Sequence, residues 1–259
     1  YSNKNGISAV PMGTNNPLKK LLVDLCRFQE ELIFKMPPIH NWAAWIGSDE
    51  CGKGDYFGPL VVCAFAIEKK QEKEFKQIGV IDSKKLKTDD INRIAKYLYK
   101  NYAKSINCIV IKPEKYNELI TKFKQEGKSL DDLLAWLHST AIIKLQKNHP
   151  ESEGVLVDQF SSSQKARRAL KEKQFPLPCL ERTGAEIDPA VAAASIIARY
   201  QFLESFNTMR NFYQLNFPQG ANGNVIKYAQ DFIKQYGEKR LGEVAKLHFK
   251  TTNQIDTNQ

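Results

Sequence analysis

The sequence of 259 residues has no long apolar run, no cysteine or histidine spacing typical of a metal site, and no secretory leader. A helix that crosses a membrane needs about 20 consecutive apolar residues, so no membrane-spanning helix is expected. The five cysteines are an odd number without a Cys-x-x-Cys pair, which argues against a disulfide framework and a zinc site. These absences predict a cytoplasmic protein without a membrane partner.

The charge balance of the chain is basic. Lys and Arg number 38 against 29 Asp and Glu, which gives a net charge of +9. Such an excess favours an anionic partner, with nucleic acid as the first candidate. Hydrophobic residues make up 42% and charged residues 26%, as in folded soluble proteins. Charge alone leaves open a basic protein that has no such partner.

The chain divides by its patterning into three parts. Residues 1–44 are predicted to be an N-terminal extension with one amphipathic helix over 17–33, which Asn16 can cap. Residues 45–250 alternate strand and helix patterns, which predicts an α/β sheet covered by helices, and residues 251–259 form a polar tail. The predicted strands are 45–49, 60–67, 106–111, 154–160 and 178–182, and the predicted helices are 88–98, 130–147, 165–173, 190–209 and 225–236.

Acidic residues at strand ends are the candidate catalytic groups. Asp49 and Glu50 are adjacent, so on a strand they point to opposite faces, and both reach one site only if the strand ends or bulges there. Asp158 ends another apolar strand, and Glu186 precedes the 190–209 helix. Carboxylates without Cys or His ligands suit Mg²⁺ or Mn²⁺, and two ions about 4 Å apart can promote phosphodiester hydrolysis. Spacing alone leaves open that these acids are helix caps or surface ion pairs.

Glycine and basic residues lie next to the acidic pair. The turn Gly52-Lys53-Gly54 lets the backbone approach a phosphate, and its lysine adds a charge, although the spacing is not that of a Walker P-loop. Lys84 and Lys85 can grip backbone phosphates, and Ser83 can donate to a phosphate or a sugar hydroxyl. By itself Ser195 is interpreted as a helix-packing residue. A tight turn and a solvated loop remain the alternatives for the two basic segments.

Six segments together resemble bacterial ribonuclease HIII, a type 2 ribonuclease H. The first is the segment 48–59, SDECGKGDYFGP, which resembles the signature of that family. The others follow in family order and extend the resemblance over roughly residues 45–250; they are 82–86 (DSKKL), 157–160 (VDQF), 185–200 (AE followed by VAAASIIARY), 218–221 (PQGA) and 245–249 (AKLHF). The resemblance implies an α/β, RNase H-like fold with a central mixed sheet flanked by helices.

The same resemblance implies an activity and a site. The enzyme is expected to be a monomer that hydrolyses the RNA strand of an RNA–DNA hybrid with two Mg²⁺ or Mn²⁺ ions, leaving 3′-hydroxyl and 5′-phosphate ends. Asp49, Glu50, Asp158 and Glu186 become the catalytic, metal-binding quartet, with Asp49 bridging both ions. Glu186 stands where ribonuclease HII carries aspartate, which favours HIII. The implied substrate-binding residues are Gly52, Lys53, Gly54, Ser83, Lys84, Lys85 and Ser195.

The sequence departs from the family in two places. Lys53 stands where threonine is common, and its charge is closer to the arginine of ribonuclease HII, which keeps cleavage at single ribonucleotides open. Residues 1–44 are too short for the usual domain resembling the TATA-binding protein, so we expect either that the catalytic domain alone binds the hybrid or that residues precede Tyr1. A non-catalytic hybrid-binding module and a DNA-cutting nuclease of the same fold are the remaining alternatives.

Overall fold

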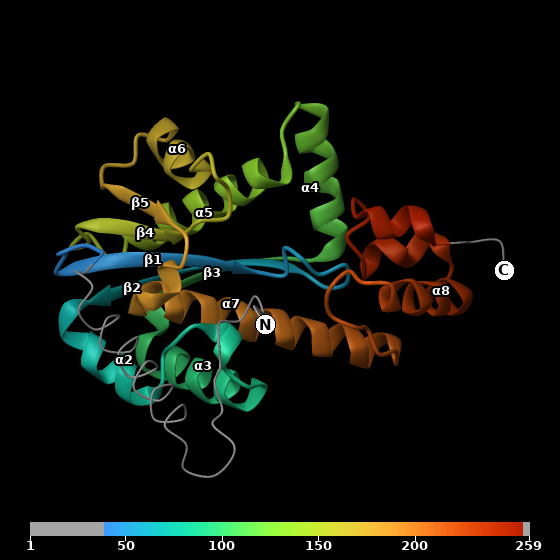
Figure 1. The fold of residues 1–259 in the computed structure, drawn as a ribbon, viewed down its shortest axis with the longest axis horizontal. Coiled ribbons are helices and arrows are strands. Elements are labelled where there is room, and N and C mark those ends of the chain that lie inside the picture. The colour runs from blue at the N-terminus through green and yellow to red at the C-terminus, as the bar shows by residue number, and fades with distance from the viewer. Residues whose placement is uncertain (1–38, 256–259) are drawn as a thin grey trace, which may run out of the picture. The chain divides into compact units, whose positions relative to one another are not determined.

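A five-stranded mixed sheet is the central element of the computed structural model, which describes residues 39–255 (Figure 1). Its strand order is β3-β2-β1-β4-β5; β2 is antiparallel to β1 and β3, whereas β4 is parallel to β1 and β5. The predicted five strands and the mixed sheet are confirmed. The strands are β1 (Ala44–Cys51), β2 (Leu60–Glu68), β3 (Ile106–Ile111), β4 (Gly154–Asp158) and β5 (Cys179–Arg182).

Helices cover both faces of the sheet (Figure 1). On one face lie α4 (Pro113–Gln125), α5 (Leu130–Gln146) and α6 (Lys165–Glu172). On the other face lie α2 (Glu72–Ile78), α3 (Thr88–Tyr102) and α7 (Pro189–Tyr213), with α8 (Asn224–Tyr236) packed beside the end of α7. The sequence interpretation did not include α2 and α4. No helix within residues 39–255 is both long and apolar enough to cross a membrane.

Alternation along β1 divides the core in two. Trp45 belongs to the apolar cluster that includes α7, and its neighbour Ile46 to the cluster that includes α5. Gly47 lies directly under the first turn of α7, where a Cβ would come within 2.3 Å of the carbonyl carbon of Ala190. Only glycine allows this approach, which brings α7 onto the strand that carries the acidic pair.

The two ends of the chain fall largely outside the described residues. The predicted 17–33 helix and residues 256–259 of the tail are not among them. Lys250–Gln254, most of which was expected to be polar tail, forms a short 3-10 helix. Thr251 is buried, and the Thr252 hydroxyl donates to the Tyr56 hydroxyl at 3.2 Å. This part of the expected tail therefore packs against the loop that follows β1.

Cys63 on β2 and Cys108 on β3 form a disulfide bond. The antiparallel register pairs the two residues directly, with their Cα atoms 4.2 Å apart, although they are separated by 45 positions in the sequence. The expectation of no disulfide is therefore wrong. It rested on spacing along the chain, whereas this pairing depends on strand register. Cys51 and Cys179 are the free cysteines among residues 39–255.

The bond predicts a redox-dependent stability. We expect Cys108→Ser to lower the free energy of unfolding by about 2–4 kcal/mol without reductant, because the open chain gains entropy when unfolded. With dithiothreitol present, wild type and variant should unfold at similar denaturant concentrations. Urea titrations followed by circular dichroism measure both, and Cys179→Ser, which breaks no disulfide bond, is the control. If Cys108→Ser lost as much stability with dithiothreitol as without it, the loss would come from altered packing and not from the missing disulfide.

Candidate active site

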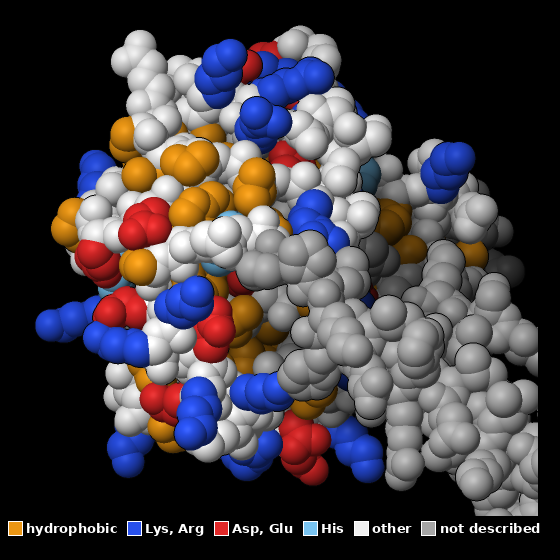
Figure 2. Space-filling model, turned by 60° about the vertical axis from the view of Figure 1, so that its left-hand side comes forward, with side chains coloured by type: hydrophobic (Ala, Val, Ile, Leu, Met, Phe, Trp, Pro, Cys, Tyr) orange, Lys and Arg blue, Asp and Glu red, His pale blue; other side chains and the backbone are white. Residues whose placement is uncertain are grey.

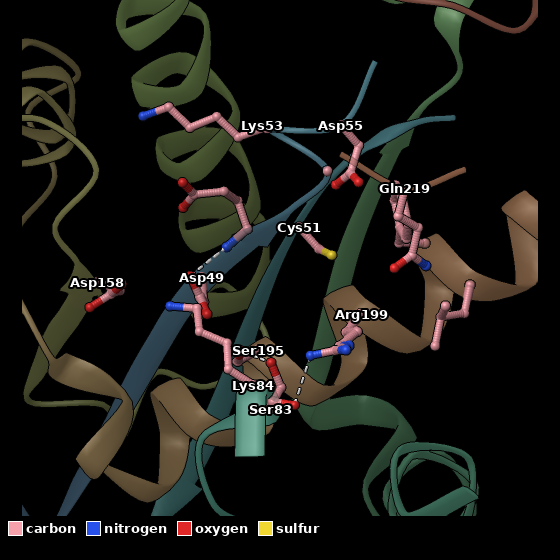
Figure 3. Close-up of a pocket in the computed structure, with 15 residues that line it drawn as sticks. Asp49, Cys51, Lys53, Asp55, Ser83, Lys84, Asp158, Ser195, Arg199 and Gln219 are labelled. Atoms are coloured by element: carbon pink, nitrogen blue, oxygen red, sulfur yellow. Dashed lines mark hydrogen bonds between the residues drawn. The ribbon is translucent and has the colours of Figure 1, made fainter. Parts of the chain in front are cut away.

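A cleft of about 320 Å³ opens beside the C-terminal end of β1. Its walls come from β1 and the loop after it, the end of β4, the 3-10 turn Ser83–Lys85 and α7 (Figure 3). Of the residues that the sequence predicted for the site, all line this cleft except Glu186 and Lys85. Lys85 is exposed beyond the cleft, and Glu186 approaches it through Lys84.

Asp49 is the most buried of the four predicted acids, with 7% of its surface exposed. Its Oδ1 accepts a hydrogen bond of 2.7 Å from the backbone N–H of Glu50, and the Ser195 hydroxyl on α7 also bonds to the carboxylate. Burial raises the pKa of Asp49 well above its usual value, and the charges of Glu50 and Asp158 raise it further. The site therefore holds a carboxylate that favours protonation unless a cation approaches.

Asp158 and Glu186 form a second acidic pair. Asp158 ends β4, and its Oδ1 accepts from the backbone N–H of Ala185 at 3.0 Å. Burial, followed by the charge of Glu186, raises the pKa of Asp158 to about 6. The Glu186 Oε1 lies 3.9 Å from the Lys84 ammonium, and its buried Oε2 has no hydrogen-bond partner.

The start of α7 places Glu186 beside Asp158. Asp188 caps the helix by accepting from the N–H groups of Ala190 and Val191, and Pro189 occupies the first helical position. The indole N–H of Trp45 on β1 donates to the same Asp188 oxygen at 3.0 Å. The cap thus joins α7 to β1 two residues after Glu186.

β1 ends at Cys51, one residue after the acidic pair, so the strand does end beside the pair, and its register shows no bulge there. Its pairing with β2 runs to Cys51, whereas its pairing with β4 stops at Ser48. Asp49 therefore faces α7 and Glu50 faces α5, where the Glu50 Oε2 lies 3.2 Å from the His138 Nε2. Both acids line the cleft because β1 has lost its β4 neighbour at this point.

The donor chemistry of the four acids fits a divalent cation. Clustered carboxylate oxygens suit hard cations, and the raised pKa values of Asp49 and Asp158 reflect repulsion and burial that a cation would offset. The unpartnered Glu186 Oε2 is a further available donor. As the side chains stand, no three Asp, Glu, His or Cys residues within 39–255 lie close enough together to hold a metal ion.

The glycine turn after β1 requires Gly52. Its φ is +88°, and a Cβ there would lie 2.2 Å from the Pro59 carbonyl oxygen. The Lys53 ammonium donates to the Phe160 carbonyl at 3.0 Å and to Asp131 at 3.3 Å, and it points away from the acids in Figure 3. The turn is therefore shaped for close backbone approach, while its lysine is held at the N-terminus of α5.

Lys84 extends toward Asp49 and Asp158 (Figure 3). Partial burial lowers its pKa, but the charges of Asp49, Glu186 and other acids outweigh this, so the pKa of Lys84 is raised. The ammonium thus serves as an internal counter-ion for the acids. The Ser83 and Ser195 hydroxyls bond to each other at 2.8 Å, so Ser195 is more than a helix-packing residue.

Three polar residues were missed by the sequence interpretation. Arg199 lines the cleft and donates to the Ser83 carbonyl at 2.9 Å. The ammonium of the buried Lys246 donates to the carbonyls of Asp55 and Gly58, each at 2.7 Å, and burial lowers its pKa to about 7. Lys246 therefore fastens the loop after the glycine turn. His138 contacts Glu50, and only its segment in the sequence, a helix of apolar spacing, could have indicated that it is buried.

The family of the chain follows from comparison with known sequences. The model of the ribonuclease HII family matches residues 46–252. The chain belongs to this family. Ribonuclease HIII of Protochlamydia amoebophila is 37% identical over 210 residues, 81% of this chain and 67% of the relative. Ribonuclease HIII of Bacillus cereus is 40% identical over 212 residues, 80% of this chain and 66% of the relative. The chain thus spans about two thirds of the length of these relatives.

Solved structures agree with this family. Bst-RNase HIII in complex with Mn²⁺ has a TM-score of 0.71 at 32% identity and covers 82% of this chain and 68% of its own. Aquifex aeolicus RNase H3 has a TM-score of 0.64 at 26% identity, covering 85% and 76%. The ribonuclease H2 of Pyrococcus horikoshii, at 21% identity, a TM-score of 0.68 and coverage of 82% and 96%, shows the fold alone. The expected RNase H-like fold and the assignment to the ribonuclease H enzymes are confirmed.

Removing one repelling carboxylate should stabilise the metal-free protein. The pKa of Asp158 is about 6 in the folded protein and lower in the unfolded chain, so near pH 5 the folded state binds more protons. As pH rises through 6, the folded protein must ionise this carboxyl group at a free-energy cost, and its stability falls. We expect Asp158→Asn to raise the free energy of unfolding by about 1–2 kcal/mol at pH 7.5, a value reduced for partial exposure. The gain should shrink toward zero at pH 4.5. Urea unfolding with a chelator at both pH values measures this, and an equal gain at pH 4.5 would contradict the electrostatic cause.

Proposed function

We propose that this chain is a metal-dependent endonuclease that hydrolyses the RNA strand of RNA–DNA hybrids and leaves 3′-hydroxyl and 5′-phosphate ends. The observation that carries the proposal is the group of acids with raised pKa values at the ends of β1 and β4, in a chain of the ribonuclease HII family. The ribonuclease HIII relatives support the hybrid as substrate. The Mn²⁺ complex of Bst-RNase HIII supports divalent metal dependence.

The four acids are proposed to hold two Mg²⁺ or Mn²⁺ ions. Asp49 would be the central ligand, since the charges of both Glu50 and Asp158 act on its carboxylate and raise its pKa. When bound, the ions supply a polarised water and stabilise the charge on the leaving oxygen. The protein holds three of the four acids by separate groups: the Ser195 hydroxyl for Asp49, the Ala185 N–H for Asp158 and the Lys84 ammonium, an ion-pair partner at 3.9 Å, for Glu186.

The substrate is proposed to lie along the cleft over the glycine turn. Backbone N–H groups at 52–54 can bind phosphates around the 2′-hydroxyl, the group by which a protein distinguishes RNA from DNA. The Ser83 and Ser195 hydroxyls face the same cleft, and Lys84 can exchange its carboxylate partners for a phosphate. Lys85 is proposed to contact the phosphate backbone of the substrate from the exposed side of its turn.

Basic side chains on the surface are suited to longer-range attraction. Figure 2 shows one face on which Lys and Arg side chains lie at the upper edge and again along the lower edge, with Asp and Glu side chains among them. The charges are mixed rather than continuous on this face. The net charge of +9 therefore favours encounter with nucleic acid, while the cleft determines where cleavage occurs.

Cleavage at single ribonucleotides in duplex DNA is the second candidate function. Lys53 favours it, since a charged residue in the glycine turn can contact a phosphate next to an isolated 2′-hydroxyl. In the structure this lysine is bound to Asp131 and Phe160, so it would have to exchange partners to do so.

Replacing the proposed central ligand should strongly reduce hydrolysis. We expect Asp49→Asn to reduce cleavage by about a hundredfold to a thousandfold, as for other groups that stabilise transition-state charge, while most hybrid affinity remains. The assay uses a labelled RNA–DNA hybrid and, separately, a DNA duplex with one ribonucleotide, each with Mg²⁺ or Mn²⁺. Asp231→Asn, the same change at an exposed position of α8, is the matched control and should keep wild-type activity.

The same assay separates the candidate functions. Preferred cleavage of the continuous hybrid supports the main proposal, and preferred cleavage beside the single ribonucleotide supports the second. Hydrolysis by Asp49→Asn near the wild-type rate would refute the metal assignment. Cleavage of DNA that holds no ribonucleotide would refute both functions.

Salt dependence tests the role of Lys53. If its ammonium contacts a phosphate, Lys53→Ala in the inactive Asp49→Asn protein should make the slope of log affinity against log salt shallower by about one. Fluorescence anisotropy with a labelled hybrid measures this slope. Lys234→Ala removes an exposed charge on α8 and should leave the slope unchanged. An unchanged slope for Lys53→Ala would mean that its bond to Asp131 persists with substrate bound.

A further inference from the structure

His138 is a fully buried histidine on the α5 side of β1, where it contacts both Ser48 and Glu50. It lies on α5 with none of its surface exposed. The Nδ1 of its ring is 2.8 Å from the Ser48 hydroxyl oxygen, and its Nε2 is 3.2 Å from the Glu50 Oε2. Ser48 and Glu50 are alternate residues of β1, so one imidazole bridges the two side chains on this face of the strand.

The hydrogen bonds among Ser48, His138 and Glu50 require that the Nε2 of His138 bonds to Glu50. The Ser48 hydroxyl is also 2.8 Å from the Cys63 carbonyl, to which it can only donate. If it does so, its oxygen accepts from Nδ1–H, and a proton lies between Nε2 and Glu50, on one or the other. If the hydroxyl instead donates to Nδ1, Nε2 carries the proton and donates. Every arrangement that satisfies the ring keeps the bond between Nε2 and the Glu50 Oε2.

Packing holds the imidazole in this orientation. The Phe160 ring stacks on it with centroids 4.9 Å apart and an interplanar angle of 15°. Phe160 also contacts the glycine turn, because its carbonyl accepts from the Lys53 ammonium and its ring lies 5.6 Å from that nitrogen. The ring of His138 therefore cannot turn without disturbing the residue that anchors Lys53.

We propose that His138 is a positioning residue that fixes the carboxylate of Glu50 for cation binding. The imidazole holds Oε2, while Oε1 makes no hydrogen bond or ion pair with the residues of the 39–255 region and is left as the donor to an ion. A carboxylate on a flexible side chain binds a cation better when one of its oxygens is fixed, because less side-chain entropy is lost. This inference rests on the proposed metal-dependent function, and it gives a role to a histidine that has no metal-ligand spacing in the sequence.

The two ring nitrogens can be tested separately. The amide nitrogen of Asn replaces Nδ1 and that of Gln replaces Nε2, so His138→Asn keeps a donor toward Ser48 and His138→Gln keeps one toward Glu50. Both variants lose the stack on Phe160, so they share the packing defect. We expect His138→Asn to weaken Mn²⁺ binding by about tenfold or more, in the range of substitutions of outer-shell partners, and His138→Gln to stay near wild type.

The probe is Mn²⁺ alone, titrated into the metal-free full chain and followed by the electron paramagnetic resonance signal of free Mn²⁺. Hybrid cleavage is measured in parallel at limiting and saturating Mn²⁺. For His138→Asn the Mn²⁺ concentration at half-maximal rate should rise, while the KM for hybrid stays unchanged, since His138 does not line the substrate cleft. Thermal unfolding of both variants should show similar shifts. Equal Mn²⁺ affinities for the Asn and Gln variants would overturn the proposal.

A Glu50→Gln background supplies an independent test, in which His138→Ala replaces His138→Asn if that variant does not fold. Adding His138→Asn or His138→Ala to Glu50→Gln should cause no further loss of Mn²⁺ affinity, because the group through which His138 acts is gone. A further loss of tenfold would overturn the proposal. If wild type binds Mn²⁺ but cleaves no hybrid, the proposed function fails while the affinities still decide the role of His138. If wild type binds no Mn²⁺, both fail.

Discussion

Asp49 and Asp158 carry carboxylates that burial and neighbouring negative charge make harder to ionise. Burying several acids together is unfavourable unless each has a donor or a cation nearby. The surrounding elements supply such donors one at a time: α7 through Ser195, the turn before α7 through the Ala185 N–H, and the Ser83–Lys85 turn through Lys84. The arrangement of these three segments is therefore coupled to the charge of the site.

These compensations are partial, which suits a site for a divalent cation. The Glu186 Oε2 is buried without a hydrogen bond, and the pKa of Asp158 remains raised in spite of its backbone donor. A protein that needed these acids only as structural ion pairs would be expected to pair them fully. Residual repulsion that a cation would relieve is typical of an active site, where stability is reduced for function.

Much of the fold could be predicted from local patterns. The apolar runs of β2 and β3 and the helix patterns over α5 and α8 predicted boundaries within one or two residues of the structure. The four acids were predicted from ordered motifs, since their spacing alone favoured helix caps or surface ion pairs. α4 was missed although Pro113 at its start, with Tyr116 and Ile120 on one face, is a local signal.

Other features depend on tertiary structure that no local pattern carries. The disulfide follows from the register that places Cys63 opposite Cys108. Burial of Lys246 follows from the β1–β2 loop folding back so that its carbonyls surround the ammonium. The role of His138 requires α5 to pack against β1. Each is a buried polar or sulfur-containing side chain whose partner is more than 40 residues away, so sequence spacing gives no information about the pairing.

The position of the site follows from the topology of β1. This strand separates the antiparallel part of the sheet from its parallel part, and it is held by β2 on one side to Cys51 but by β4 on the other only to Ser48. Asp158 at the end of β4 pairs instead with Arg182 of β5. The two parallel neighbours thus diverge where their acids lie, which opens a gap at the carboxyl edge of the sheet. Two adjacent acids on opposite faces of an intact strand can therefore serve one cleft, without the bulge that the alternation of side chains first suggested.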